Sequence, residues 1–159
     1  YALFCEQSKS FNLSCDLEFM PWTAVQNLKQ AQYIVDQSCQ KNAAILIDSL
    51  HFDRSDSTID EVKTLPKASI NYVQICDGLS NYDTSDEGLI KVARTNRLIP
   101  GEGDIDLVAL IAALPKNMTL AAEVPNVELA KLPALKRAQK NLEALKKLTE
   151  MAEQLVIAE

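Results

Sequence analysis

The 159-residue sequence predicts an α/β fold with a parallel sheet, because short apolar runs alternate with amphipathic helical segments along the chain. A second observation supports this fold class. Each of four strand-like runs ends in a side chain that can bind a metal ion through oxygen, namely Glu18, Asp48, Gln74 and Glu123. The carboxyl ends of parallel strands lie side by side, so these side chains could converge. Clustered acids are costly without a cation, and a divalent metal ion is therefore expected.

Four runs rich in apolar residues indicate the strands. Residues 43–48 are apolar until the final aspartate, as expected of a strand that is buried on both faces of a parallel sheet. The expected strands cover residues 11–19, 43–48, 70–76 and 118–124.

Helix signals separate these strands. Thr58 followed by Glu61 resembles a capping box, which opens a short helix that stops before Pro66. The other helices are expected from Thr23 as cap to about Ser38, from Asp104 as cap to Leu114, and from Pro133 to about Val156. Residues 1–10 would be the tail of a preceding helix. Residues 77–103 are expected to form a long polar loop, and such loops are often functional.

Alternating strands and helices imply a parallel sheet with right-handed crossovers. Four such units could form a small open sheet or half of an eight-stranded barrel, and composition does not choose between them. An open sheet usually builds its site at one switch point, whereas a barrel draws on several strands around its rim. Since all four strands deliver a polar residue at the same end, we expect half of a barrel.

Composition excludes several classes of protein. The net charge is −6 and no basic stripe is present, so nucleic acid is not an expected partner. No apolar run approaches the roughly 20 residues that span a bilayer, and no signal peptide is visible. The cysteines show no CxxC pairing, which favours free thiols in a reducing cytoplasm over disulfides or a zinc site. They are Cys5, Cys15, Cys39 and Cys76.

The segment after the second expected strand carries the most chemistry. Asp48 ends the strand, and His51 and Arg54 follow in what we expect to be a loop above it. A carboxylate can hold a metal while the imidazole exchanges protons with a substrate, and an arginine can grip a carboxylate or phosphate. The alternative is that Asp48 caps a turn, His51 is a solvated loop residue and Arg54 is a surface charge.

The other candidates also have structural alternatives. Glu18 and Glu123 sit among apolar residues and could form core ion pairs, for example with an arginine, while Gln74 could make a core hydrogen bond. The four candidates together are more specific than any one. Arg97 precedes a loop with two glycines around Glu102 and is a plausible anion contact. This glycine pattern matches neither a dinucleotide-binding nor a P-loop fingerprint.

Taken together, these motifs resemble the xylose-isomerase-like barrels of the sugar phosphate isomerase/epimerase superfamily. That group includes inosose and 3-dehydroshikimate dehydratases and ketose 3-epimerases. The resemblance covers residues 11 to about 125. It rests on Leu-Glu18-Phe-x-Pro21, Asp48-x-x-His51-x-x-Arg54-Ser55, Val-Gln74-x-x-Asp77, Arg97-x-x-Pro100-Gly-Glu-Gly-Asp and Glu123.

The resemblance implies a (β/α)8 TIM barrel in which strands five to eight supply the ligands of one divalent metal. The implied metal ligands are Glu18, Asp48, Gln74 and Glu123. By the same resemblance, His51 contacts the substrate, and Arg97 binds it from the loop after strand seven; Arg54 is a further candidate substrate contact. Mg²⁺ or Mn²⁺ suits an all-oxygen shell best, with Co²⁺ or Zn²⁺ as alternatives.

Two features depart from the family pattern. Many members have histidine where this chain has Gln74, and glutamine there resembles the 3-dehydroshikimate dehydratase branch. Eight units also need about 250 residues, whereas four strands are expected here. The chain is therefore expected to be a half-barrel fragment, the C-terminal half, with strands five to eight and a C-terminal helix. The single domain would comprise β/α units at residues 10–126 and a helical segment at 127–159.

The implied function is a metal-dependent isomerase or epimerase that forms an enediolate from a ketose, polyol or cyclic hydroxy-ketone. Glu18 and Glu123 would transfer protons on opposite faces of this small carbohydrate substrate. One alternative is a dehydratase of the same fold with His51 as acid or base. Another is a non-catalytic half-barrel that pairs with itself, as a homo-oligomer, or with an N-terminal half, because open strand edges seek partners.

Overall fold

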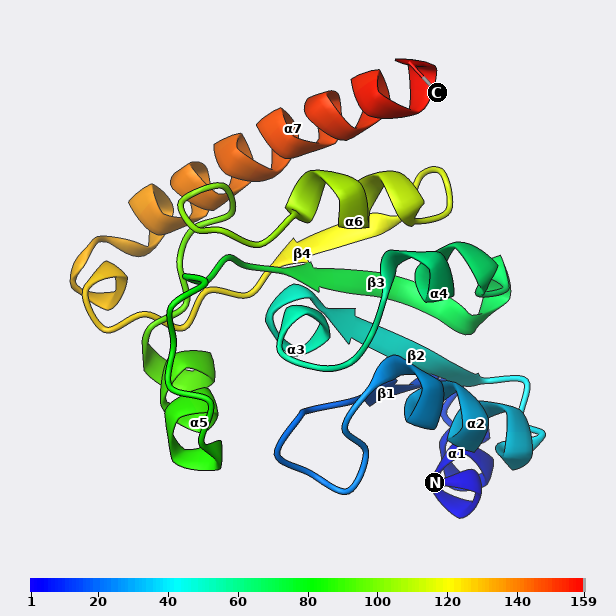
Figure 1. Ribbon diagram of the computed structural model, residues 1–159. Helices are drawn as coiled ribbons and strands as arrows, with labels where there is room; N and C mark the ends of the chain where they lie inside the picture. Colours follow the sequence, from blue (N-terminus) through cyan, green and yellow to red (C-terminus); the bar gives the residue numbers. More distant parts are fainter. Residues whose placement is uncertain (159) are drawn as a thin grey trace.

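Within residues 1–158, which the computed structural model describes, the chain forms a four-stranded parallel sheet in the order β1-β2-β3-β4 (Figure 1). The strands are β1 (Cys15–Glu18), β2 (Ala43–Asp48), β3 (Ile70–Ile75) and β4 (Thr119–Ala122). All neighbouring strands pair in parallel, and their carboxyl ends point to the same side. The prediction of four parallel strands in chain order is therefore confirmed; β2 has the predicted bounds, and the other three strands are shorter than predicted.

Helices connect the strands. They are α1 (Ala2–Lys9), α2 (Leu28–Ser38), α3 (Ser49–Asp53), α4 (Ile59–Thr64), α5 (Asp86–Thr95), α6 (Leu107–Ala113) and α7 (Ala134–Ala158), with short 3₁₀ turns at Lys67–Ser69 and Leu129–Lys131. The capping box at Thr58 and Glu61 is confirmed, since each side chain accepts the other residue's backbone N–H. None of the helices formed by residues 1–158 is both long enough and apolar enough to cross a bilayer.

Two predicted helix caps were wrong. The side chain of Asn27, not Thr23, accepts a backbone N–H at the start of α2, because Thr23 is occupied in a turn between Met20 and Val25. Asp106, not Asp104, caps α6. Asp104 instead accepts the backbone N–H of Ser80 at 2.7 Å.

The predicted long loop also contains a helix. Ser85 caps α5, and its side chain accepts the N–H of Gly88, while Asp86 and Glu87 place acidic groups in the first turn. Only a narrow strip of α5, including Leu89 and Ala93, is buried. This short apolar strip explains why the segment looked like a polar loop.

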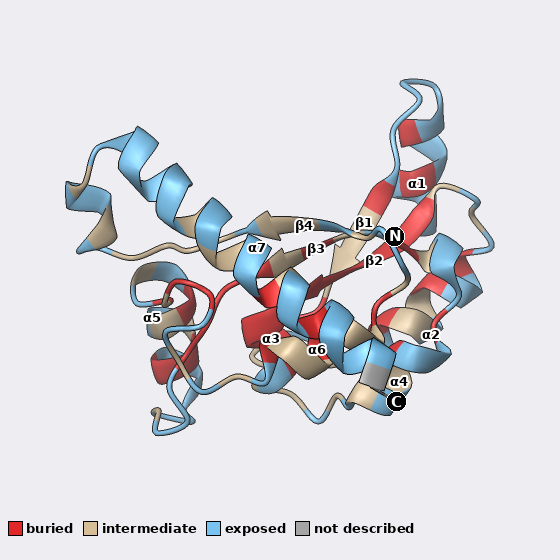
Figure 2. Ribbon diagram, turned by 90° about the horizontal axis from the view of Figure 1, so that it is seen from above, coloured by how far each residue is buried: buried red, intermediate tan, exposed pale blue. Residues whose placement is uncertain are grey.

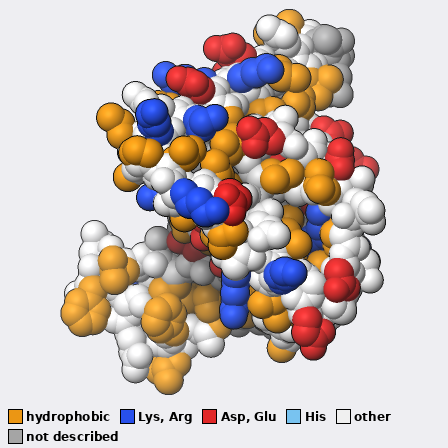
Figure 3. Space-filling model, turned by 90° about the vertical axis from the view of Figure 1, so that its left-hand side faces the viewer, with side chains coloured by type: hydrophobic (Ala, Val, Ile, Leu, Met, Phe, Trp, Pro, Cys, Tyr) orange, Lys and Arg blue, Asp and Glu red, His pale blue; other side chains and the backbone are white. Residues whose placement is uncertain are grey.

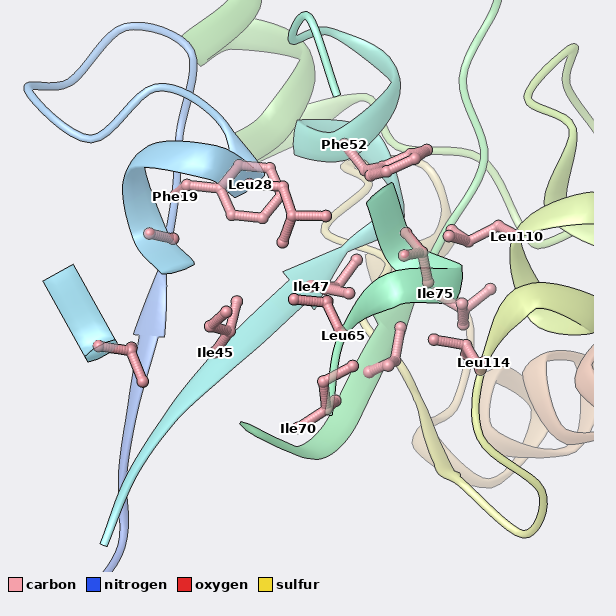
Figure 4. Close-up of a cluster of buried hydrophobic side chains, with 14 of the residues drawn as sticks. Phe19, Leu28, Ile45, Ile47, Phe52, Leu65, Ile70, Ile75, Leu110 and Leu114 are labelled. Carbon is pink, nitrogen blue, oxygen red and sulfur yellow. The ribbon is translucent and has the colours of Figure 1, made fainter. Parts of the chain in front are cut away.

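The hydrophobic core lies between the sheet and the helices that cover one of its faces, as Figure 2 shows by burial. Ile45 and Ile47 of β2 point to this side and belong to the same buried cluster as Leu28 of α2 and Leu110 of α6 (Figure 4). The cysteines within residues 1–158 are free; Cys5, Cys15 and Cys76 are buried, as expected, whereas Cys39 is exposed.

Strand register aligns the polar residues on the opposite face. Asp48 pairs with Gln74, and Gln74 pairs with Ala121, two residues before Glu123. Glu18 pairs with Leu46, two residues before Asp48. Side chains two residues apart on a strand share a face, so the polar ends of the four strands are directed to one side of the sheet.

Candidate active site at the carboxyl ends of the strands

An ionic cluster lies at the carboxyl ends of the strands, the end that faces the viewer in Figure 3. Arg97, which follows α5, reaches over this end. Its Nη1 lies 2.5 Å from Oδ2 of Asp48 and 3.0 Å from Oε2 of Glu123. Nε2 of His51 lies 3.5 Å from Oε1 of Glu18. The structure thus brings together five of the residues that the sequence singled out.

Asp48 is the centre of the cluster and is fully buried. Its Oδ1 accepts the backbone N–H groups of Leu50 at 2.9 Å and His51 at 3.1 Å, which makes it the N-cap of α3. Its Oδ2 accepts a hydrogen bond from Nη1 of Arg97. The capping role that was considered as an alternative is therefore real, and the same carboxylate also belongs to the ionic cluster.

The expectation that His51 lies in a loop was wrong. It lies in α3 with 2% of its surface exposed, because Asp48 starts a helix directly after the strand. The Trp22 ring meets it edge-on, with centroids 5.0 Å apart. Burial lowers the pKa of His51 to about 4, although Asp48 opposes this shift and Arg97 adds to it. The imidazole is therefore neutral at pH 7 and can accept a hydrogen bond at its unprotonated ring nitrogen.

Glu18 has the opposite perturbation. Burial raises the pKa of its carboxyl to about 7, and the charges of Asp48 and Glu123 add to the shift, while Arg97 opposes it. Burial also raises the pKa of Glu123, against the effect of Arg97. A carboxyl with a pKa near neutrality can both take and give a proton under physiological conditions.

Gln74 lies in β3 beside Asp48 in register, while Val73 and Ile75 on either side are fully buried in the core. Its Oε1 is buried and has no hydrogen-bonding partner among residues 1–158. The core hydrogen bond that was the alternative is therefore not made by this oxygen within the described chain. An acceptor in this state needs a ligand or a further donor.

Arg54 is not part of the cluster. Its Nη2 donates to the carbonyl of Leu79 at 2.6 Å, and its guanidinium lies 3.6 Å from the centre of the Tyr82 ring. It also pairs with Asp53 and lines a shallow pocket of about 180 Å³. These contacts bind Arg54 to the loop at residues 78–82. A contact between Arg54 and a substrate stays a prediction.

Two further residues shape the site and were given no role by the sequence. Trp22 forms a wall beside His51, and the only sequence signal was its place directly after Pro21. Asp77 is 1% exposed and accepts the backbone N–H groups of Gly78, Gly101 and Ile105, so it fixes the loop that follows Arg97. The only indication of this role in the sequence was the position of Asp77 directly after the third expected strand.

The donor set fits a divalent cation. One ligand atom from each of Glu18, Asp48 and His51 can be chosen so that all lie within 4.8 Å of one another. The unpartnered Gln74 oxygen is directed to the same face, and two carboxylates, Asp48 and Glu123, share a single arginine. Carboxylate and amide oxygens are the ligands that hard divalent cations prefer.

A parallel α/β sheet in which every strand carries a polar residue at its carboxyl end is typical of TIM barrels. The chain belongs to the xylose isomerase-like TIM barrel family, whose model matches residues 4–148. The predicted family and fold class are thereby confirmed, with the four strands matching a fragment of such a barrel.

Two curated relatives are inosose isomerases. That of Bacillus velezensis is 29% identical over 146 residues, which cover 87% of this chain and 50% of the relative. That of Bacillus subtilis is 29% identical over 109 residues, 67% of this chain and 37% of the relative. The chain spans about half the length or less of these relatives. Its assignment to strands five to eight, the C-terminal half, stays a prediction.

Solved structures show the same fold at lower identity. The IolI protein with a bound zinc atom superposes with a TM-score of 0.82 at 23% identity, over 93% of this chain and 53% of the other. An L-ribulose 3-epimerase superposes with a TM-score of 0.70 at 15% identity, over 99% and 54%.

Proposed function

We propose that the protein containing this chain is a divalent-metal-dependent isomerase or epimerase of a ketose, polyol or cyclic hydroxy-ketone. The observation that carries this proposal is the convergence of Glu18, Asp48, His51 and Glu123 at one rim of the sheet, with the Gln74 oxygen unpartnered beside them. The named activities of the relatives, inosose isomerase and L-ribulose 3-epimerase, fall in this class.

Glu18, Asp48, Gln74 and Glu123 would hold the metal. When bound, a divalent cation polarises a carbonyl group and makes the neighbouring C–H more acidic. Mg²⁺ or Mn²⁺ suits an oxygen shell, and the zinc in the similar IolI structure supports Zn²⁺ as the alternative.

The chain's own residues supply the proton transfers. Glu18 takes the proton from the carbon next to the carbonyl. In an isomerase the proton returns to the adjacent carbon, and in an epimerase Glu123 delivers a proton to the opposite face. His51, neutral at pH 7, accepts a hydrogen bond from a substrate hydroxyl. Trp22 shields this imidazole from water.

The test is a metal titration of the full-length protein combined with an activity assay. Chelation should abolish isomerisation or epimerisation of ketoses and inososes, and Mg²⁺ or Mn²⁺ should restore it. Exchange of the substrate's carbon-bound hydrogen with deuterated solvent should follow the same pattern. Activity that survives complete chelation would overturn the proposal.

A further inference from the structure

Arg54 directly follows α3 as its C-cap, three residues after His51, and its side chain contacts the loop that follows β3. Its Nη2 donates to the carbonyl of Leu79 at 2.6 Å, and the centre of its guanidinium lies 3.6 Å from the centre of the Tyr82 ring. Its Nη1 pairs with Asp53, and only 4% of the side chain is exposed. Cation–π contacts and charged hydrogen bonds are stronger when they are shielded from water, so these contacts bind α3 firmly to the loop.

Gly78, the first residue of this loop at residues 78–82, allows the loop to lie close to Arg54. A Cβ atom at residue 78 would lie 2.9 Å from Nη2 of Arg54 and 3.0 Å from Cδ1 of Leu50. Leu50 is buried, so the guanidinium would have to move away from the loop. The glycine therefore leaves the space that the Arg54 side chain fills.

The loop is also bound to the segment that follows Arg97. The N–H groups of Asp77 and Leu98 each donate to the carbonyl of the other residue, at 3.0 and 2.9 Å. Oδ2 of Asp104 accepts the N–H of Ser80 at 2.7 Å. Leu98 is the residue after Arg97, so a displacement of the loop would shift the backbone that carries this arginine.

From these contacts we propose that Arg54 is a positioning residue. It anchors the loop at residues 78–82 to α3, and the loop in turn holds the segment that carries Arg97, itself an expected substrate contact, at the ionic cluster. Nη2 of Arg97 lies 3.5 Å from Nε2 of His51. Helix α3 thus carries His51 and, through Arg54, also fixes the position of Arg97 beside it. The effect on turnover rests on the proposed function, whereas the anchoring of the loop does not.

The first experiment measures hydrogen exchange in the full-length protein without metal or substrate. The backbone N–H groups of Ser80, Gly101 and Ile105 donate to side-chain carboxylates and report on the loop and the segment bound to it. Arg54→Met should speed their exchange by about tenfold or more, because the shielded cation–π contact is lost. Arg94→Met, which removes an exposed arginine of α5, should leave their exchange unchanged. Unchanged exchange in Arg54→Met would overturn the proposal.

Tyr82→Leu removes the other side of the cation–π contact and keeps Arg54. Faster exchange of the same N–H groups is expected in this variant as well. If Arg54→Met fails to fold, Tyr82→Leu decides the proposal by the same measurement, and unchanged exchange in it would overturn the anchoring role.

The second experiment separates a positioning role from a direct substrate contact. It measures kcat and KM of Arg54→Met, Tyr82→Leu and the double variant with a ketose or inosose that the wild type converts. If Arg54 acts through the loop, both single variants lower kcat, and the double variant is no slower than the slower single variant. If Arg54 instead binds the substrate directly, Arg54→Met raises KM while Tyr82→Leu stays near wild type, and that result would overturn the proposal. If the wild type converts none of these substrates with any divalent metal, the proposed function fails, and hydrogen exchange alone decides the role of Arg54.

Discussion

Single residues at this site carry two roles at once, and Asp48 is the clearest case. Its Oδ1 caps α3 and its Oδ2 pairs with Arg97, so both oxygens have partners within the protein. A carboxylate has about four lone-pair positions, which leaves room for a metal ion as well. The cap orients the carboxylate, and it also places His51 one helical turn above the strand end.

Substitutions of single residues can separate the residues that bind the metal from those that only assist turnover. Glu18→Gln or Asp48→Asn should lower both metal affinity and rate. His51→Asn should leave metal affinity nearly intact and lower turnover by about tenfold, because the imidazole that accepts a hydrogen bond from the substrate hydroxyl is lost. Metal titration and turnover of each variant are the measurements. A His51→Asn protein that loses metal and rate in parallel would make His51 a ligand in place of Gln74.

Gln74 offers a test that separates metal binding from stability. Its Oε1 is buried without a partner in the described chain, so Gln74→Met removes an uncompensated polar atom while keeping the volume. The metal-free protein should keep or gain thermal stability, whereas metal affinity should fall. Thermal unfolding with and without Mn²⁺ gives both quantities. A clear loss of stability without metal would mean that Gln74 has a structural partner.

At the scale of the elements, apolar strand runs and the Thr58 capping box were predictable because local sequence decides them. Helix α5 was not, because tertiary contacts of Leu89 and Ala93 stabilise a mostly polar segment that contains Gly88. The burial of His51 was also beyond the sequence. It depends on Asp48 starting a helix and on Trp22 packing against the ring. The Asp48–His51 spacing was visible, but not the helix between them.

The capping box of α4 gives a prediction for an element. Thr58→Ala removes the acceptor for the N–H of Glu61 and should lower the free energy of unfolding by about 1 kcal/mol. Thr58→Ser keeps an acceptor and is the matched control, with an expected loss well below that value. Urea unfolding of both variants measures the difference. Equal losses would show that methyl packing, not the cap, stabilises this helix start.

Glu61 adds a pH dependence to the same helix. Slight burial opposes the shift, but Lys29 and the N–H of Thr58 hold the pKa of Glu61 below its ordinary value. A depressed carboxyl pKa stabilises the fold above the unfolded pKa of about 4.3, and this stability is lost as the pH falls through the folded value. Glu61→Gln should therefore reduce stability at pH 7 and flatten its decline in acid. An unchanged acid profile would contradict this assignment.

At the scale of the whole molecule, neither outer strand is paired on its outer edge within residues 1–158. Strand β1 ends the sheet on one side and β4 on the other. Helices α1 and α7 lie toward these opposite edges and expose large apolar side chains, among them Phe4 at 60% and Leu142 at 54% (Figure 1). Open parallel edges next to exposed apolar groups favour pairing with another chain or chain segment.

The isolated polypeptide of residues 1–159 should therefore self-associate, and sedimentation velocity should show a concentration-dependent shift from monomer to larger species. Phe4→Glu places a charge on α1 beside the β1 edge and should increase the monomer fraction. Tyr33→Glu changes an equally exposed aromatic residue, 67% accessible, on α2, whose opposite side covers the sheet, and should leave association unchanged. In the full-length protein, if further β/α units cover the α1 edge, Phe4→Glu should instead lower the Tm more than Tyr33→Glu. A polypeptide that stays monomeric at all concentrations, with both variants alike, would mean that this edge is not an interface.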